Sequence, residues 1–398
     1  MKRVVVLVLG VLLLAGLAAT ASVAGKLLIW ADDTRTPIMQ EVAARFTAAY
    51  GVEVEIQQVG FSDMPGQLLT AGPAGEGPDI LIGPHDKLGE LIQNGLLEPI
   101  VLPTAVIRDF NPSAITAFTW GGLLYGVPYA IENVALIYNK ALLPVLPSTF
   151  EGLLTLAKGL TDIEAGKYGL LIQEPDPYHT FALFSAGGGY IFGYDANGVL
   201  NPCDVGLDNA GSIAGAKLLD QMVKDGIEVA GADYGLVTGL FGQGKLAAMI
   251  GGPWTLSDLQ KAGINYGVAA IPTIGGNVPK VFSGVQAFEI SYYSKNKVLA
   301  NLFVKDFLVT KPVMLRLFEL GNRPPCYLPA LADLSGNADI QGFAAAGGNS
   351  IPMPNIPQMN SVWSPWSDAL GFIVNQTLDP ETAMKNAATQ IRTTLGCP

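Results

Sequence analysis

Apolar positions recur along the chain with two different periods. Residues 27–30 form a short apolar run typical of a buried strand, and the next segment places four apolar side chains on one helical face: Ile38, Met39, Val42 and Phe46. Thr36-Pro37 supplies an N-cap and a first-turn proline for that helix. Residues 52–56 alternate as a strand does, and the apolar run 79–82 follows Gly77-Pro78. This order of strand, helix and strand predicts parallel pairing with a right-handed crossover.

A second set of such units follows. Ser148 or Thr149 can cap a helix, and residues 209–225 form a strong amphipathic helix with Gly226 as its stop. The apolar runs 247–250 and 266–271 are typical of buried strands. No tandem repeat or low-complexity linker separates the two sets. The sequence therefore predicts an α/β protein of two domains whose chain crosses between them more than once.

The first 24 residues have the pattern of a secretory signal peptide. Lys2 and Arg3 precede an apolar run, 4–17, which is short for a membrane span, and Ser22-Val23-Ala24 is a small-x-small cleavage site. No cysteine stands at that site, so we expect no lipid anchor. A soluble chain beginning near Gly25 is expected in the periplasm or outside the cell.

The composition narrows the classes of partner. The chain of 398 residues has 34 acidic and 23 basic residues, a formal net charge of −11, which disfavours nucleic acid and anionic membranes. Its three cysteines, Cys203, Cys326 and Cys397, match no metal-ligand spacing. One disulfide with a free thiol and three free thiols both remain open.

Two apparent catalytic patterns are incomplete. Residues 239–245 match the phosphate-loop spacing, but Leu246 stands where the Mg²⁺-binding hydroxyl is needed, and no strand is expected before the loop. His85 and His179, the only histidines, lie far apart and are expected to pack or hydrogen-bond rather than hold a metal. We therefore expect neither a cofactor nor a metal.

Carboxylates and tryptophans are more informative. Glu132 lies in an apolar stretch, where an unpartnered carboxylate would be costly, so it is either paired or at a cleft. With the nearby pair Glu174 and Asp176 it leaves glycoside hydrolysis open as an alternative. Trp254 follows a Gly-Gly-Pro turn, which suits a cleft better than a core. Aromatic rings with charged neighbours favour a sugar site, because a sugar has an apolar C–H face and a rim of hydroxyls.

Several motifs, in order along the chain, carry a family resemblance: 27–30, 77–80 with His85-Asp86, 136–140, 206–211, 252–254 and 352–359. With them the chain resembles the periplasmic maltose/maltodextrin-binding proteins, within the broader group of extracellular solute-binding proteins, over essentially its whole length after the signal peptide. The resemblance implies an α/β, two-lobed, type II periplasmic-binding-protein fold, each lobe a sheet flanked by helices with the ligand cleft between them. The N-terminal lobe would hold 25–130 and 287–332, and the C-terminal lobe 131–286 and 333–398.

The resemblance also implies the binding residues. Asp176 and Tyr178 stand for an acidic ligand and a stacking ring of the family, Trp254 and Trp363 for its two main stacking tryptophans, and Met353 belongs to the last motif. Trp366 adds a ring near Trp363. The remaining residues implied to bind sugar hydroxyls are Asp32, Arg35, Asp86, Lys87 and Glu132. Gly83, where family members carry a tryptophan, and Ser367, where an arginine is common, depart from the pattern and leave the chain length of the sugar open.

These implications add up to a solute-binding protein of an ABC sugar importer, not an enzyme. We expect it to bind a maltose, maltotriose or maltodextrin type of oligosaccharide, to close around it, and to dock as a monomer on membrane permease subunits. Trehalose or another sugar, a secreted glycoside hydrolase and a sensory sugar-binding module are the alternatives.

Overall fold

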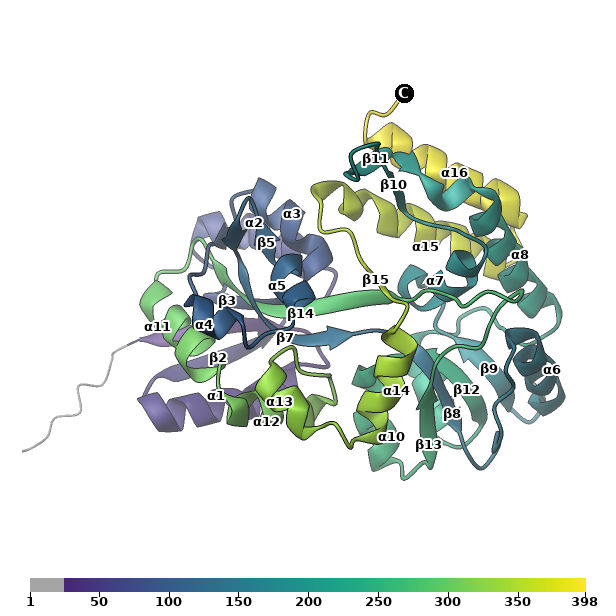
Figure 1. Cartoon of the computed structure of the whole chain (residues 1–398), viewed down its shortest axis with the longest axis horizontal. Helices are drawn as coiled ribbons and strands as arrows, with labels where there is room; N and C mark the ends of the chain where they lie inside the picture. Colours follow the sequence, from purple (N-terminus) through teal and green to yellow (C-terminus); the bar gives the residue numbers. More distant parts are fainter. Residues whose placement is uncertain (1–24) are drawn as a thin grey trace, which may run out of the picture.

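The computed structural model describes residues 25–398 and has two lobes with a mixed α/β composition (Figure 1). The expected signal peptide, 1–24, lies outside the described residues. Two long neighbouring strands run from the first lobe toward the second: β7 (Gly126–Glu132) and β14 (Phe282–Ser291). They pair antiparallel, with Gly284 opposite Glu132. Segments from distant parts of the chain therefore meet at the lobe junction.

The sheet of the first lobe has the order β15-β14-β3-β1-β2, with β4 and β7 also paired to β14. The pairs β1–β2 and β1–β3 are parallel, as predicted, whereas β14 runs antiparallel to β3. The other strands of this sheet are β1 (Lys26–Ala31), β2 (Glu53–Gln58), β3 (Ile80–Pro84), β4 (Leu97–Glu98) and β15 (Ile351–Pro352).

Helices cover this sheet. The predicted first helix is α1, and of its four predicted apolar positions Met39, Val42 and Phe46 are buried in the core and Ile38 is partly buried against it. Gly51 ends it in the left-handed conformation, at φ 70°. The helices of this part of the chain are α1 (Thr36–Tyr50), α2 (Met64–Ala74), α3 (Leu88–Gln93), α4 (Thr104–Ile107), α5 (Pro112–Ala117), α11 (Lys297–Asn301), α12 (Lys311–Gly321) and α13 (Leu328–Asp333).

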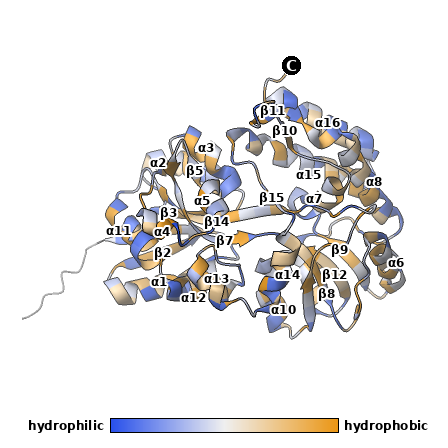
Figure 2. Ribbon diagram, viewed as in Figure 1, coloured by the Kyte–Doolittle hydropathy of each residue, from blue (hydrophilic) through white to orange (hydrophobic). Residues whose placement is uncertain are grey.

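The second lobe has a four-stranded sheet in the order β13-β8-β12-β9, in which β12–β9 is parallel and the other pairs are antiparallel. Of the two predicted buried strands, β12 is buried throughout, whereas β13 is an edge strand and mostly half-buried; the colours of Figure 2 show how hydrophobic β8 and β12 are. The strands of this lobe are β8 (Ala135–Asn139), β9 (Tyr168–Ile172), β12 (Leu246–Gly251), β13 (Tyr266–Ala269) and the pair β10 (Phe192–Tyr194) and β11 (Leu200–Val205).

Local capping fixes the helices of the second lobe. Thr149, not Ser148, caps α6, accepting a hydrogen bond from the Gly152 N–H, and Asn209 caps α8 in the same way. Within the described residues no helix is both long and apolar enough to cross a membrane. The helices are α6 (Phe150–Leu160), α7 (Pro177–Ala186), α8 (Ala210–Lys224), α9 (Tyr234–Gly242), α10 (Leu256–Lys261), α14 (Ala338–Gly347), α15 (Asn360–Val374) and α16 (Pro380–Thr394).

The hydrophobic cores change at the crossing strands. Side chains up to Ala130, and from Val285 to Ala330, belong to one buried cluster. Val134 to Phe282, and the segment from Met353 onward, supply a second cluster. A third lies on the other face of the four-stranded sheet. Each lobe thus buries its own apolar side chains, and the strands between the lobes carry polar groups.

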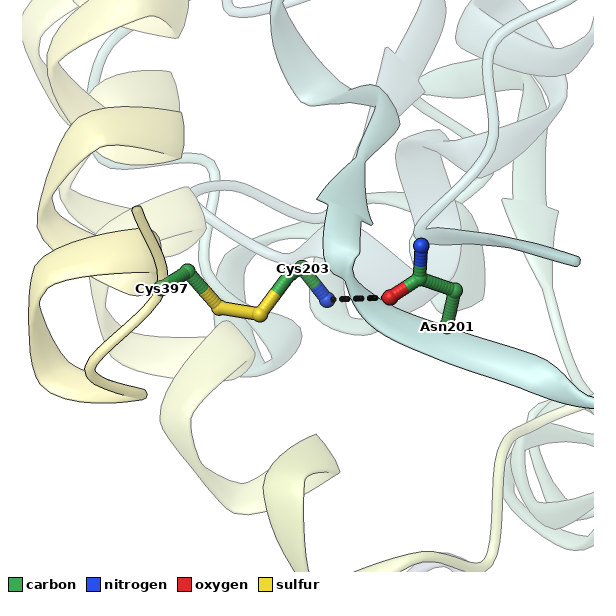
Figure 3. The surroundings of a disulfide bond; sticks show 3 residues. All are labelled: Asn201, Cys203 and Cys397. Carbon is green, nitrogen blue, oxygen red and sulfur yellow. Dashed lines mark hydrogen bonds between the residues drawn. A yellow bond between two sulfur atoms is a disulfide. The ribbon is translucent and has the colours of Figure 1, made fainter. Parts of the chain in front are cut away.

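A disulfide closes the end of the chain. Cys203 on β11 and Cys397 after α16 are bonded, with their Cα atoms 5.4 Å apart (Figure 3), and Cys326 is a buried free thiol. Of the two possibilities left open by the sequence, the structure has one bridge and one thiol. The bond ties α16, which packs on α8 and α15, to the strand pair of the second lobe.

Candidate functional site at the lobe junction

Residues from the first lobe gather at one edge of its sheet. Asp32 and Arg35 follow β1, and the short turn His85–Lys87 follows β3. Because β1 and β3 are parallel, both segments lie at the carboxyl ends of strands, where α/β proteins commonly bind ligands. Glu132, the last residue of β7, joins them through Arg35.

Glu132 is paired rather than isolated. Arg35 Nη2 lies 3.3 Å from Glu132 Oε1, and Arg323 Nε lies 2.6 Å from the same oxygen. Gln286 donates a hydrogen bond to the other oxygen at 3.3 Å. Arg35 also pairs with Asp32 and donates from Nε to the Tyr129 hydroxyl at 2.7 Å. These groups form a buried polar cluster, which we call the Glu132 cluster.

The charges in the Glu132 cluster support one another. Burial alone would raise the pKa of Asp32, but the Arg35 and Arg323 guanidinium groups hold that pKa below its ordinary value. Burial likewise works against the charge of Arg35, and its acidic neighbours raise its pKa overall. Arg35 therefore stays charged and serves as a fixed donor at the lobe junction.

Asp86 and Trp363 link the lobes directly. The Trp363 indole N–H donates to Asp86 Oδ2 at 3.0 Å, and Lys87 Nζ donates to Asn360 Oδ1 at 2.7 Å. Both partners lie on α15 of the second lobe. The sequence-predicted residues Asp86, Lys87 and Trp363 are thus brought together at the junction, although Asp86 and Trp363 are 277 residues apart in the sequence.

His85 holds the neighbouring backbone. The Val285 N–H donates to its Nδ1 at 3.1 Å, so its Nε2 carries the proton and donates to the Met353 carbonyl at 3.0 Å. Burial lowers the pKa of His85, which favours this neutral tautomer. The predicted hydrogen-bonding role of His85 is confirmed, and Met353 contributes its backbone to the junction.

The aromatic side of the site comes from the second lobe. Tyr178, on α7, directs its hydroxyl at the carbonyls of Glu132 and Phe282, at 3.2 and 3.4 Å. The Trp254 ring lies with its centroid 6.2 Å from that of Tyr178 and 5.8 Å from that of His179, edge to face with the latter. Both Tyr178 and Trp254 remain partly exposed. Tyr178 therefore lies beside the Glu132 cluster, and Trp254 lies next to Tyr178.

Asp176 acts first as a helix cap. Its Oδ1 accepts hydrogen bonds from the Tyr178 and His179 backbone N–H groups at 2.7 and 3.4 Å, and His179 Nδ1 lies 2.8 Å from Oδ2. Burial pushes the pKa of Asp176 up, but His179 and the capping bonds lower it below the ordinary value. The carboxylate orients the turn that carries Tyr178, and its side chain is 26% exposed.

Trp366 lies in the core of the second lobe rather than at the site. Its side chain is fully buried and its ring meets those of Phe184 and Phe181 edge-on, at centroid distances of 5.5 and 6.1 Å. The prediction that Trp366 adds a ring to the site is therefore wrong. Its spacing along α15 from the buried residues Val362, Ala369 and Ile373 is that of an inward helical face, whereas Trp363 lies outside that face.

Sequence reasoning missed Arg323 and two buried carboxyl groups, Glu289 and Glu228, and it named Glu174 without its burial. Glu289 on β14 and Glu174 before α7 have both carboxyl oxygens buried without a hydrogen-bond partner. Burial raises both pKa values well above the ordinary range, reinforced by Asp86 for Glu289 and by Glu228 and Asp176 for Glu174. Burial also raises the pKa of Glu228 to about 8. These groups are therefore protonated in the folded chain well above the pH at which ordinary carboxyls ionise.

The buried carboxyl groups make the stability of the folded chain depend on pH. A carboxyl with a raised pKa in the folded chain binds its proton more tightly there than in the unfolded chain, so stability falls as pH rises from about 5 to about 8. We expect the melting temperature to fall over this range. Glu174→Gln, which removes one such group at nearly constant shape, should lessen the fall by about 2–4 °C. Differential scanning calorimetry of both proteins measures it.

The matched control is Glu164→Gln, which changes an exposed glutamate of the same lobe and should leave the slope of melting temperature against pH unaltered. If Glu174→Gln kept the full wild-type slope, the buried Glu174 carboxyl would not be a source of the pH dependence.

The phosphate-loop spacing is not realised as such a loop. Residues 239–242 are the last residues of α9, and the chain then enters β12. This order, helix before strand, is the reverse of the strand-loop-helix arrangement that binds phosphate.

Most of the chain is similar to known solute-binding proteins. The family model described as bacterial extracellular solute-binding protein matches residues 41–345. A galactooligosaccharide-binding protein of Bacillus subtilis (strain 168) is 32% identical over 384 residues, covering 93% of this chain and 90% of that protein. A maltooligosaccharide ABC transporter solute-binding lipoprotein of Streptococcus pneumoniae is 32% identical over 385 residues, covering 93% and 89%.

A solved structure has the same architecture. It is the maltotriose binding protein of Thermus thermophilus bound with maltotriose, which superimposes with a TM-score of 0.88 at 32% sequence identity. The match covers 93% of this chain and 100% of that one. The expected two-lobed fold is thereby confirmed.

Proposed function

The chain belongs to the family of bacterial extracellular solute-binding proteins, and on that premise we propose that it captures a maltose, maltotriose or maltodextrin type of oligosaccharide for an ABC sugar importer. The relatives include proteins named for maltooligosaccharides and one named for galactooligosaccharides. Maltotriose is our first choice because the structure bound to it matches 93% of this chain.

The observation that carries the proposal is the pairing of partly exposed aromatic rings with charged groups at the lobe junction. Tyr178 lies beside the Glu132 cluster with Trp254 next to it, and Trp363 donates a hydrogen bond to Asp86. A pyranose ring offers a C–H face to the rings and hydroxyls to the charged groups. Hydrogen bonds to charged groups contribute about 1.5–3 kcal/mol each, so a few of them with stacking suffice for micromolar affinity.

Closure of the lobes is the proposed mechanism. The charged groups Asp32, Arg35, Asp86, Lys87 and Glu132 come from the first lobe and its crossing strand, and the rings come from the second. A ligand gains both sets of contacts only when the lobes approach, so it stabilises the closed form. The strands β7 and β14, which cross the junction, are the natural hinge. The lobe boundaries 25–130 with 287–332, and 131–286 with 333–398, fit the change of hydrophobic core and remain part of the proposal.

The proposed function also involves the location of the protein, its oligomeric state and its partners. We take the secreted chain to be free of a lipid anchor, to bind as a monomer, and to dock in its closed form on permease subunits. A binding role rather than glycoside hydrolysis is supported by the carboxylates themselves. Glu132 accepts a hydrogen bond from Arg35 and forms an ion pair with Arg323, and Asp176 caps α7, so both carboxylates are engaged in holding the site.

A thermal-shift panel tests the function. Maltotriose at 100 times its dissociation constant should stabilise the folded chain by about 2.7 kcal/mol, a rise in melting temperature of about 3–4 °C. Maltose, maltotetraose, trehalose and a galactooligosaccharide complete the panel, with ribose at equal concentration as the solvent control. No shift with any gluco-oligosaccharide would refute the proposal, and a shift with the galactooligosaccharide alone would move the ligand to that class.

A further inference from the structure

The loop after β2 lies at the same edge of the first sheet as the candidate site. The loops after β1 and β3 carry Asp32, Arg35 and Asp86, and β2 is parallel to β1. The Val59 N–H donates to the Ala31 carbonyl at 2.9 Å, which holds the start of the β2 loop beside Asp32. Two residues later the chain reaches Phe61.

Phe61 is unusual among the phenylalanines of this protein. Only Phe61 and Phe372 are exposed among those in the described residues, whereas the others are buried in the cores. Phe61 is 39% exposed, and the Arg35 guanidinium carbon lies 5.5 Å from the centre of its ring. Arg35 is itself almost fully buried in the Glu132 cluster. The ring of Phe61 is therefore positioned by a residue of the site while part of its surface stays open.

The first-lobe side of the site otherwise consists of charged groups. Gly83 at the end of β3 brings no side chain, and a Cβ there would stand 3.1 Å from Glu289 Oε2. The stacking rings described so far, Trp254, Tyr178 and Trp363, all belong to the second lobe. A pyranose ring has two faces, and a sugar held between two lobes needs an apolar surface on each side to bury both.

We propose that Phe61 is the aromatic platform of the first lobe and stacks on a pyranose ring of the bound oligosaccharide beside Arg35. The inference rests on the proposed function and adds a specificity-determining residue to it. A flat ring with one part fixed by a cation and another part exposed suits the C–H face of a sugar. Its loop position allows it to contact sugar without disturbing the core.

The test is calorimetric titration of maltotriose into a set of variants. Phe61→Ala and Phe61→Leu should each weaken binding about three- to tenfold, because both remove the flat ring. Phe61→Tyr keeps the ring and should stay within about twofold of the wild type. Phe372→Ala, which removes the other exposed phenylalanine from the far part of α15, should bind as the wild type does. Melting temperatures without sugar verify that the variants are folded.

The outcomes separate this inference from the proposed function. If the wild type and Phe61→Ala bind maltotriose with the same affinity, the proposed role of Phe61 is overturned but the proposed function is not. Wild-type affinity in Phe61→Leu, with loss in Phe61→Ala, would mean that Phe61 only packs on Arg35, and this also overturns the inference. A wild-type protein that binds no sugar of the panel overturns both proposals.

Discussion

Replacing Glu132 by alanine is expected to lower the free energy of unfolding by about 3–5 kcal/mol, because it leaves two buried guanidinium groups without their shared acceptor. Arg35 and Arg323 both pair with Glu132 Oε1, and all three side chains are only 4–6% exposed. Neither arginine can lose its charge by deprotonation at ordinary pH. The desolvation cost of both cations is therefore no longer offset by Glu132.

Denaturant unfolding at neutral pH measures this loss as a shift of the transition midpoint. Glu132→Gln keeps the shape and one acceptor oxygen, so its cost should be smaller than that of alanine. Glu53→Gln is the matched surface control, because its Lys26 partner and Glu53 are 49% and 71% exposed, and it should cost less than about 1 kcal/mol. A cost below about 1 kcal/mol for Glu132→Ala would show that water, not Glu132, compensates the arginines.

Replacing Trp254 by alanine should weaken maltotriose binding at least tenfold, about 1.4 kcal/mol or more. The ring lies beside Tyr178 and His179 and is partly exposed, while the neighbouring Thr255 and Leu256 are buried. Its removal takes away a stacking surface without removing a core residue. The fold should therefore survive the change, and the loss should appear in affinity.

Calorimetric titration with maltotriose gives the affinity, and the melting temperature without sugar verifies the fold. Trp254→Phe retains a flat ring and should recover most of the binding. An unchanged affinity in folded Trp254→Ala would exclude Trp254 from the site, while leaving the assignment of the ligand to the sugar panel.

The sequence predicted most residues of the candidate site, but not which of them contact one another. Asp86 and Trp363, predicted separately, contact each other, and Glu132 with Arg35 does as well. Arg323 gave no signal, because nothing in its local sequence indicates a charge partner that precedes it by nearly two hundred residues. Trp366 was assigned to the site from its nearness to Trp363 along the chain, but its spacing of four, three and seven residues from Val362, Ala369 and Ile373 places it on the buried face of α15.

The sequence by itself determined the local backbone. The apolar runs predicted β1, β12 and β13, a cap at Ser148 or Thr149 predicted the start of α6, and Gly226 predicted the end of α8, because each depends on neighbours within a few residues. Tertiary structure alone decided which cysteines pair, across 194 residues, and how Glu132 is neutralised. It also brought Phe61 to Arg35. The physical reason is that these contacts join side chains whose separation in space depends on the path of the whole chain, which local periodicity does not encode.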